Sequence, residues 1–293
     1  MNGCGWARSL VLILGLMVAG GGRCAVQPQA FGTWWWRGRE LSEWERCRDR
    51  LDFLSAQGVN EIYCAIDFAA TPRAHIARFV RAAAAQGMRV ACLAGDVSWI
   101  MPGQLGFDEL YGAFRAYQRA VPAEERFFAL HLDVEPHQDH VLGDARRWQL
   151  YADFVLRATA MVHRDGFLVE WDIPFWLDGK FVTVGVRERV SLLEAVMDHS
   201  DGVVLMSYRD TAAAILETGR EELALAKTRP CRVLFGAETG KTDEGDFVSF
   251  FEEGKAALKA ELQKVRAVLA QTHLRAGSGI SVHHVGSWQA LRE

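Results

Sequence analysis

The sequence of 293 residues predicts a (β/α)8 barrel, an α/β fold in a single domain. Short apolar segments recur eight times after residue 30, and segments with helical spacing separate them, as in barrels of this kind. No Pro/Gly/Ser-rich linker divides the chain. A doubly wound open sheet would need a glycine-rich phosphate loop after its first strand, and WWWRGRE at 34–40 lacks that pattern.

The predicted strands are short runs of apolar and β-branched or aromatic residues. They cover 31–36, 59–67, 88–96, 127–135, 167–175, 202–210, 231–239 and 279–288.

Helix signals fill the intervals between these strands. The spacing predicts a helix over 41–58, with Ser42 as N-cap candidate and Gly58 as its stop. A second helix is predicted over 71–87, and a long amphipathic one over 246–272. A helix after each of the first seven strands completes the barrel pattern.

The N-terminus is predicted to be a signal peptide over residues 1–25. Arg8 precedes an apolar run at 10–19, and small residues follow it. A run of this length is too short to span a bilayer but suits a signal sequence. We therefore expect a secreted or periplasmic protein whose barrel domain covers 26–293, with no membrane span after cleavage.

Composition excludes some partners. The formal net charge is −4 and half of the residues are hydrophobic, so no basic excess favours nucleic acid. Cleavage after residue 25 would leave four cysteines, which form no CxxC pair and no zinc spacing. We expect them to be buried as small apolar side chains, and we expect no cofactor. These cysteines are Cys47, Cys64, Cys92 and Cys231.

The fourth predicted strand alternates apolar and titratable residues. Leu130, Leu132 and Val134 alternate with His131, Asp133 and Glu135. Alternate residues of a barrel strand face its interior, so the second set is expected to point inward. Burial of unpaired charges is costly, and carboxylates at the carboxyl end of a barrel strand indicate catalysis. Asp133 and Glu135 are therefore catalytic candidates.

Polar residues also end the other predicted strands, and such a ring is typical of a barrel active site. We assign Glu238 as a further catalytic candidate, and Asp67, His131, Asp172 and Tyr208 as substrate-binding candidates.

Tryptophans gather at the same predicted strand ends. Flat aromatic rings stack on sugars, and the indole N–H can bind a hydroxyl group. Trp35 and Trp288 are assigned to substrate binding, whereas Trp171 is expected in the core because it alternates outward. The remaining tryptophans of this set are Trp34, Trp36, Trp99 and Trp176.

The fourth strand resembles that of the chitinase-like glycoside hydrolases of family 18, which carries Asp-x-x-Asp-x-Asp-x-Glu. The chain has Asp133-x-Glu135 there, with His131 in place of the preceding acid, and it has Met206-x-Tyr208 on the sixth strand. Trp288 matches the family's tryptophan at the end of strand eight. The resemblance implies that Glu135 is the general acid. It also implies that Asp133 and Tyr208 hold a substrate acetamido group that acts as internal nucleophile.

A second group of glycoside hydrolases is also similar. Its members use an acid/base Glu in Asn-Glu-Pro on strand four and a nucleophilic Glu on strand seven. Val134-Glu135-Pro136 resembles the first motif without its Asn, and Glu238 lies at the position of the nucleophile. Such retaining enzymes hold the two carboxyl groups about 5–5.5 Å apart.

The sequence thus favours a glycosidase that acts on a poly- or oligosaccharide. Two alternatives remain open. One is a carbohydrate-binding barrel without catalysis. The other is a barrel enzyme that binds a divalent cation through the acids and His131. Chelation would separate the second alternative from the first.

Overall fold

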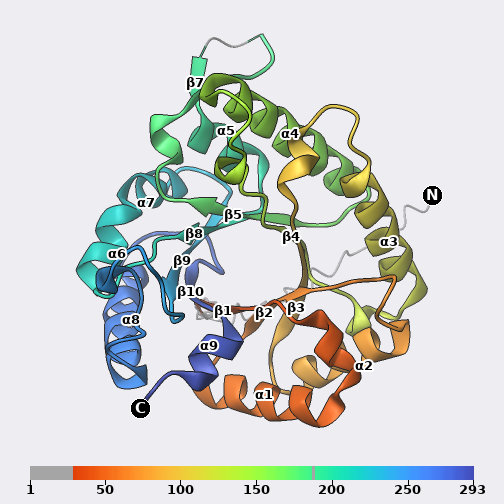
Figure 1. Cartoon of the computed structure of the whole chain (residues 1–293), viewed down its shortest axis with the longest axis vertical. Helices are drawn as coiled ribbons and strands as arrows, with labels where there is room; N and C mark the ends of the chain where they lie inside the picture. Colours follow the sequence, from red (N-terminus) through yellow and green to blue (C-terminus); the bar gives the residue numbers. More distant parts are fainter. Residues whose placement is uncertain (1–28, 187–188) are drawn as a thin grey trace, which may run out of the picture.

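The computed structural model describes residues 29–186 and 189–293 and confirms the predicted (β/α)8 barrel. Eight parallel strands close in the order β1-β10-β9-β8-β5-β4-β3-β2 (Figure 1). The predicted signal peptide lies outside the described residues. The strands are β1 (Ala30–Trp35), β2 (Glu61–Ala65), β3 (Arg89–Ala94), β4 (Leu130–Leu132), β5 (Val169–Pro174), β8 (Gly202–Met206), β9 (Arg232–Glu238) and β10 (Gly279–His283).

Helices surround the ring of strands on all sides (Figure 1). In the part of the chain that the structure describes, no helix combines the length and apolar character needed to cross a membrane. The α-helices are α1 (Trp44–Gln57), α2 (Arg73–Ala85), α3 (Gly106–Ala120), α4 (Asp144–Arg164), α5 (Leu192–His199), α6 (Ala212–Thr218), α7 (Arg220–Ala226), α8 (Lys255–Ala270) and α9 (Val285–Ala290). Short 3-10 helices are η1 (Gly38–Ser42), η2 (Val97–Ile100), η3 (Ala123–Glu125), η4 (Pro136–Gln138), η5 (Leu177–Gly179) and η6 (Asp246–Val248).

Two predicted helix starts are wrong. Ser42 belongs to η1, so α1 begins at Trp44, while Gly58 ends it in the left-handed conformation as predicted (φ 80°). The helix predicted from residue 246 begins only at Lys255, because Gly254 has a φ of 89° that a helix cannot contain.

Two features at strand ends were not predicted. An antiparallel hairpin of β6 (Phe181–Thr183) and β7 (Arg189–Ser191) connects β5 to α5 along the chain, and β7 lies at the outer edge of the molecule, outside the ring (Figure 1). The last strand ends at His283, five residues earlier than the prediction, and the chain turns directly into α9.

The predicted alternation along the strands is present. Leu130, Leu132 and Val134 belong to the large core between barrel and helices, together with Trp171. The four cysteines predicted to be buried are buried and free. The interior of the barrel has its own apolar cluster, which includes Trp34, Tyr63, Leu93, Val204 and Leu234.

Tyr63 fills the middle of the barrel. Its ring stacks on His131 with centroids 4.1 Å apart, and its hydroxyl lies 3.2 Å from Ser281 Oγ. Gly32 allows this placement, since a Cβ there would lie 2.4 Å from the Tyr63 hydroxyl. The side chain divides the interior into an amino-terminal and a carboxyl-terminal half.

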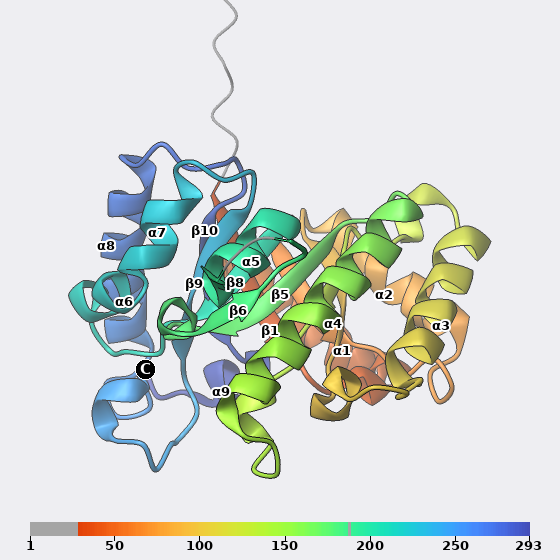
Figure 2. The same cartoon turned by 90° about the horizontal axis from the view of Figure 1, so that it is seen from above.

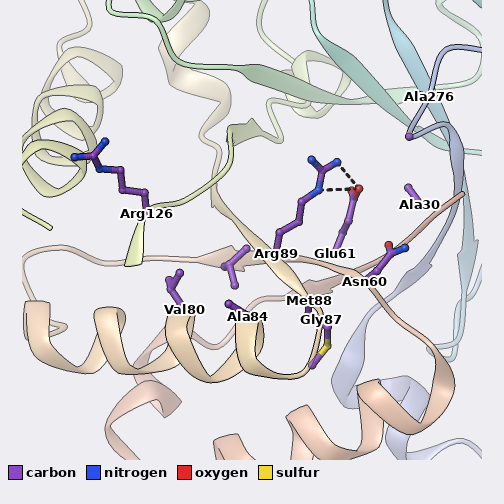
Figure 3. A pocket seen from close by; sticks show the side chains of 12 residues that line it. Ala30, Asn60, Glu61, Val80, Ala84, Gly87, Met88, Arg89, Arg126 and Ala276 are labelled. Carbon is purple, nitrogen blue, oxygen red and sulfur yellow. Dashed lines mark hydrogen bonds and ion pairs between the residues drawn. The ribbon is translucent and has the colours of Figure 1, made fainter. Parts of the chain in front are cut away.

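The amino-terminal half is closed by ion pairs around Arg232. Its guanidinium group binds Glu170 at 2.6 and 2.8 Å and Glu61 at 2.8 Å through two nitrogens. Arg89 donates to the same Glu61 from the edge of an adjoining cavity of about 550 Å³ (Figure 3). Because these charges satisfy one another at the end of the barrel that serves stability, they do not indicate a reactive centre.

The carboxyl-terminal ends of the strands form the opposite rim. The loops after β4 and β9 extend beyond the barrel on this side (Figure 2). This rim is where barrels of this kind place their active sites.

Candidate active site

His131 is the deepest titratable side chain of β4 and is fully buried. Its Nε2 lies 3.0 Å from Asp172 Oδ1, and its Nδ1 lies 3.5 Å from Glu170 Oε2. Burial alone would lower the pKa of His131, but the two carboxylates outweigh it and raise the pKa to about 9. The imidazole is therefore a cation that links the amino-terminal ion pairs to the acids above it.

Asp172, on β5, receives a second partner at its other oxygen. The indole N–H of Trp34 donates to Asp172 Oδ2 at 2.8 Å, and both side chains are buried. The Trp34 hydrogen bond and the ion pair with His131 hold the carboxylate in one orientation.

Asp133 lies next to this group, just beyond the end of β4. Burial, followed by the carboxylates of Asp172 and Glu135, raises its pKa well above the usual value. Its Oδ1 is buried and has no hydrogen-bond partner among the described residues. Its environment therefore favours the protonated form of Asp133, and one of its oxygens has no hydrogen-bond partner in the described chain.

Glu135 is closer to solvent, with a side chain 22% exposed. It accepts a hydrogen bond from Gln138 in the following turn, and His137 Nε2 lies 3.5 Å from its Oε2. Burial and the charge of Asp172 raise the pKa of Glu135, although Gln138 and His283 act against this rise. A raised pKa and access from the mouth are what a general acid needs.

Glu238, at the end of β9, has the opposite environment. His283 Nδ1 lies 2.6 Å from its Oε2, and the backbone N–H groups of Thr239 and Gly240 donate to Oε1 at 2.7 and 2.6 Å. Burial alone would raise the pKa of Glu238, but these donors lower it below the usual value. Glu238 is therefore held as an anion.

His283 connects Glu238 to the surface of the mouth. The indole N–H of Trp36 donates to His283 Nε2 at 2.8 Å, so Nδ1 carries the proton that faces Glu238. The Trp36 side chain is fixed by this bond, yet 38% of the residue is exposed. It offers a flat aromatic face beside the carboxylates.

Tyr208 closes the group from the loop after β8. Its ring lies 5.8 Å from that of His283 and next to Gly236, where a Cβ would approach the tyrosine ring at 3.1 Å. Burial, and then the charges of Glu238, Asp172 and Asp133, raise the pKa of Tyr208 well above its usual value. The phenol therefore stays protonated, and Asp133 is among the acids close enough to act on its pKa.

Three predicted substrate-binding residues lie elsewhere. Trp35 is fully buried on the helix side, where its ring packs on Phe79 at 5.0 Å, so its assignment is wrong. Trp288 is also misassigned: it lies in α9 and packs on Phe31 and Phe53 at 5.6 and 5.4 Å.

Asp67 lies at the carboxyl-terminal rim, as predicted, but its carboxylate binds the backbone of its own loop. Oδ1 accepts the backbone N–H groups of Ala69 and Ala70 at 3.1 and 3.0 Å and so caps a turn. The residue lines a groove of about 670 Å³ along the ends of β1, β2 and β3, which Trp36 also lines. Asp67 is thus beside the mouth, away from the acids.

Parity could have found the residues that sequence reasoning missed. Along the first strand, the two tryptophans that flank Trp35 alternate inward, and these are Trp34 and Trp36. Along the last strand, Ile280 and Val282 face the helices, so His283 faces inward. The extended strand predicted to residue 288 concealed this pattern.

The alternative of a metal centre has no ligand set here. Within residues 29–186 and 189–293, no three His, Cys, Asp or Glu side chains are arranged around one possible ion position. Of the acids and the histidine considered for it, His131 pairs with Asp172 and Glu238 pairs with His283.

Fold and rim together define a (β/α)8 barrel with acids at its carboxyl-terminal mouth, the architecture of many glycoside hydrolases. A class V chitinase from Pseudomonas fluorescens Pf-5 is similar in structure, with a TM-score of 0.53 and 13% identity over 90% of this chain and 99% of that one. The spore cortex-lytic enzyme SleL of Bacillus megaterium QM B1551 gives 0.52 and 10%, over 90% and 73% of the two chains.

A sugar epimerase shares the fold to the same degree. A D-psicose 3-epimerase gives a TM-score of 0.51 and 10% identity, over 87% of this chain and 85% of that one. At such identities the similarity shows the barrel fold alone. No protein-family model matches the sequence, and no curated protein matches it.

Proposed function

We propose that the protein is a glycoside hydrolase in which Glu135 is the general acid. One observation carries this proposal: two glutamates at one mouth have pKa values displaced in opposite directions. Opposite displacement favours the protonated form of Glu135 and the anionic form of Glu238, the combination that acid-assisted glycosidic cleavage uses. His283 connects the two, since it binds Glu238 and lowers the pKa of Glu135.

The proposed reaction follows the substrate-assisted route. Glu135 gives its proton to the glycosidic oxygen as the bond from that oxygen to the anomeric carbon breaks. The carbonyl oxygen of the substrate's own acetamido group attacks the anomeric carbon, and Asp133 and Tyr208 orient that group. Water then opens the cyclic intermediate and returns a proton to Glu135.

The raised pKa of Asp133 supports this assignment. A protonated carboxyl group and a phenol can each donate or accept a hydrogen bond, and the effect of Asp133 on the pKa of Tyr208 supports a position close to one another. We therefore propose a substrate that contains N-acetylhexosamine, such as chitin or a peptidoglycan strand. Export, which rests only on the predicted signal peptide, would bring the enzyme to such polymers.

Substitution of the acid tests the proposal. Wild-type protein and the Glu135→Gln variant would be incubated with chitin, peptidoglycan and plant and mucin glycans, and reducing ends would be measured. We expect the variant to lose a factor of about 10²–10⁴ in rate with unchanged thermal stability, because an amide cannot supply the proton. Glu109→Gln, an exposed change on α3, is the control.

Other outcomes would redirect the interpretation. Near wild-type turnover by the Glu135→Gln variant would remove Glu135 as the acid. Binding without hydrolysis by the wild type would favour the non-catalytic carbohydrate-binding barrel. Activity lost on chelation and restored by a divalent cation would favour the metal-dependent alternative.

A further inference from the structure

A second pocket lies beside the mouth and is lined by arginines. It has a volume of about 440 Å³ and lies between the end of β1, the helix α1 and the start of α9. Trp36, Arg37, Arg46, Arg50 and His284 line it, together with the backbone at 285–287. Three guanidinium groups converge there, and none of the lining residues is acidic.

The surrounding acids do not neutralise these arginines. Glu40 lies behind the pocket, where it accepts a hydrogen bond from Arg50 and lies 3.4 and 3.7 Å from Arg46 and Arg37. Glu43 adds one contact to Arg46 at 3.6 Å. Three cations against two carboxylates leave a net positive charge. Since the whole chain has a net charge of −4, the pocket is not part of a general basic surface.

The exposure of the three arginines increases from the buried end of the pocket to its opening. The Arg50 side chain is 10% exposed, Arg46 is 47% exposed and Arg37 is 71% exposed. Arg50 is fixed by Glu40 and by the Trp35 ring 5.5 Å below it. Gly286 leaves the floor open, because a Cβ there would lie 3.9 Å from Arg50 Nη2 and closer still to His284.

His284 adds a neutral donor to this pocket. Burial, followed by the nearby His283, lowers its pKa to about 4, and Arg50 and Arg37 act in the same direction. Its Nδ1 accepts the Gly286 N–H at 3.0 Å, which leaves the proton on Nε2.

Trp36 joins this pocket to the catalytic mouth. The same indole lines the pocket and the groove along β1, β2 and β3, and its N–H binds the His283 that holds Glu238. A glycan stacked on Trp36 would extend one substituent toward the arginines while another unit lies near Glu135.

We propose that this arginine pocket binds a carboxylate on the glycan, so that the substrate is an acidic polysaccharide. Guanidinium groups bind a planar carboxylate through two parallel hydrogen bonds, which gives both affinity and orientation. The inference deepens the proposed hydrolase function and rests on it for the glycan at the mouth.

Binding measurements test the inference without turnover. The Glu135→Gln protein would be titrated by calorimetry with three tetrasaccharides: chitotetraose, a peptidoglycan-type tetrasaccharide with carboxylates, and its carboxyl-reduced form. We expect the carboxylate form to bind about tenfold more tightly than the reduced form, with the difference shrinking at high salt. A sulfated chitotetraose distinguishes sulfate from carboxylate as the anion.

Variants locate the anion on the protein. Arg37→Gln combined with Arg46→Gln should abolish the preference for the carboxylate form and leave affinity for the reduced form unchanged. Arg39→Gln is the matched control, since Arg39 is 85% exposed and lines the adjoining groove but not the pocket. Arg50 is left intact because its removal would leave the buried Glu40 without its hydrogen-bond donor.

The outcomes separate the two proposals. Three results would overturn the carboxylate pocket and leave the hydrolase proposal standing. They are equal affinity for the carboxylate and reduced forms, a double variant that binds both forms equally more weakly, and tighter binding of the sulfated sugar. Carboxylate-selective binding with no hydrolysis by the wild type would support the pocket and remove the hydrolase. If none of the sugars binds, both proposals fail.

Discussion

Glu135 and Glu238 are the same residue type at the same rim, and their neighbours give them different chemistry. Burial, and then the nearby carboxylate of Asp172, favour the protonated form of Glu135, whereas three N–H groups favour the ionised form of Glu238. We expect Glu238 to orient His283 and Trp36, because both of its oxygens are already engaged.

Removal of Glu238 distinguishes this role from that of a nucleophile. In the Glu238→Ala variant we expect a rate loss smaller than that of Glu135→Gln, with no recovery on addition of azide. A nucleophile would behave differently: its loss would abolish turnover, and azide would rescue it by occupying the position of the carboxylate. Turnover with azide, compared with the same concentration of chloride, decides between them.

Glu222, on α7, is a buried acid outside the site. Its carboxylate oxygens have no hydrogen-bond partner in the described chain, and burial raises its pKa to about 8. A raised pKa means that the folded state resists ionisation, so stability is lost as pH rises from 4.5 through about 8.

The Glu222→Gln variant should therefore gain stability relative to wild type as pH rises. The difference should grow by up to about 1.4 kcal/mol per pH unit within that window, because glutamine carries no charge to ionise. Urea unfolding at acidic, neutral and mildly alkaline pH measures it. The Glu221→Gln variant, at an exposed neighbour, should show no such trend. A stability difference between Glu222→Gln and wild type that does not change with pH would contradict the raised pKa of Glu222.

At the scale of elements, glycines decide where helices start. Gly254 has a left-handed φ of 89°, and a Cβ there would lie 2.9 Å from the Arg292 carbonyl oxygen. Gly112, in contrast, lies inside α3 with open space at its Cβ position. The same substitution should have opposite effects at the two positions.

Gly254→Ala should destabilise the protein by about 1–2 kcal/mol, since alanine disfavours a left-handed backbone and would press on the C-terminal segment. Gly112→Ala should stabilise it by about 0.5–1 kcal/mol through helix propensity. Chemical denaturation of both variants provides the measurement. Destabilisation by both would show that α3 has no room at Gly112.

At the scale of the whole molecule, the ion pairs of Arg232 join β2, β5 and β9 inside the barrel. The guanidinium is buried and holds the pKa of Glu170 at about 2, against the effect of burial, with help from His131. A lowered pKa means that this stability is present above pH 4.5 and is lost as pH falls through about 2.

Arg232→Met should therefore cost about 3–5 kcal/mol at neutral pH, because it leaves buried carboxylates unpaired. The gap to wild type should narrow as pH falls, since protonation of Glu170 in the variant removes its unpaired charge. Arg89→Met, which removes a half-exposed partner of the same Glu61, should cost about 1 kcal/mol or less. Equal losses from both variants, measured by urea unfolding, would refute the central role of Arg232.

Local sequence patterns were enough to predict the barrel fold. Strand alternation has a period of two residues that any segment expresses by itself, so the eight strands and the packing of Leu130, Leu132 and Val134 in the core were predictable. Gly58 was predictable as a helix end because left-handed backbone favours glycine. The hairpin of β6 and β7 was not, since its strands are only three residues long.

The sequence by itself determined the fold and the alternation of titratable residues from His131 to Glu135, at and just beyond the end of β4, because periodicity along one strand is a local property. Only the tertiary structure decided the partners of the tryptophans on the first strand, since it brought Trp34 to Asp172 and Trp36 to His283. It alone brought His283 to Glu238, and Arg37, Arg46 and Arg50 to one pocket with His284. Barrel closure places the last strand beside the first, and no pattern along the chain encodes the contacts that this closure creates.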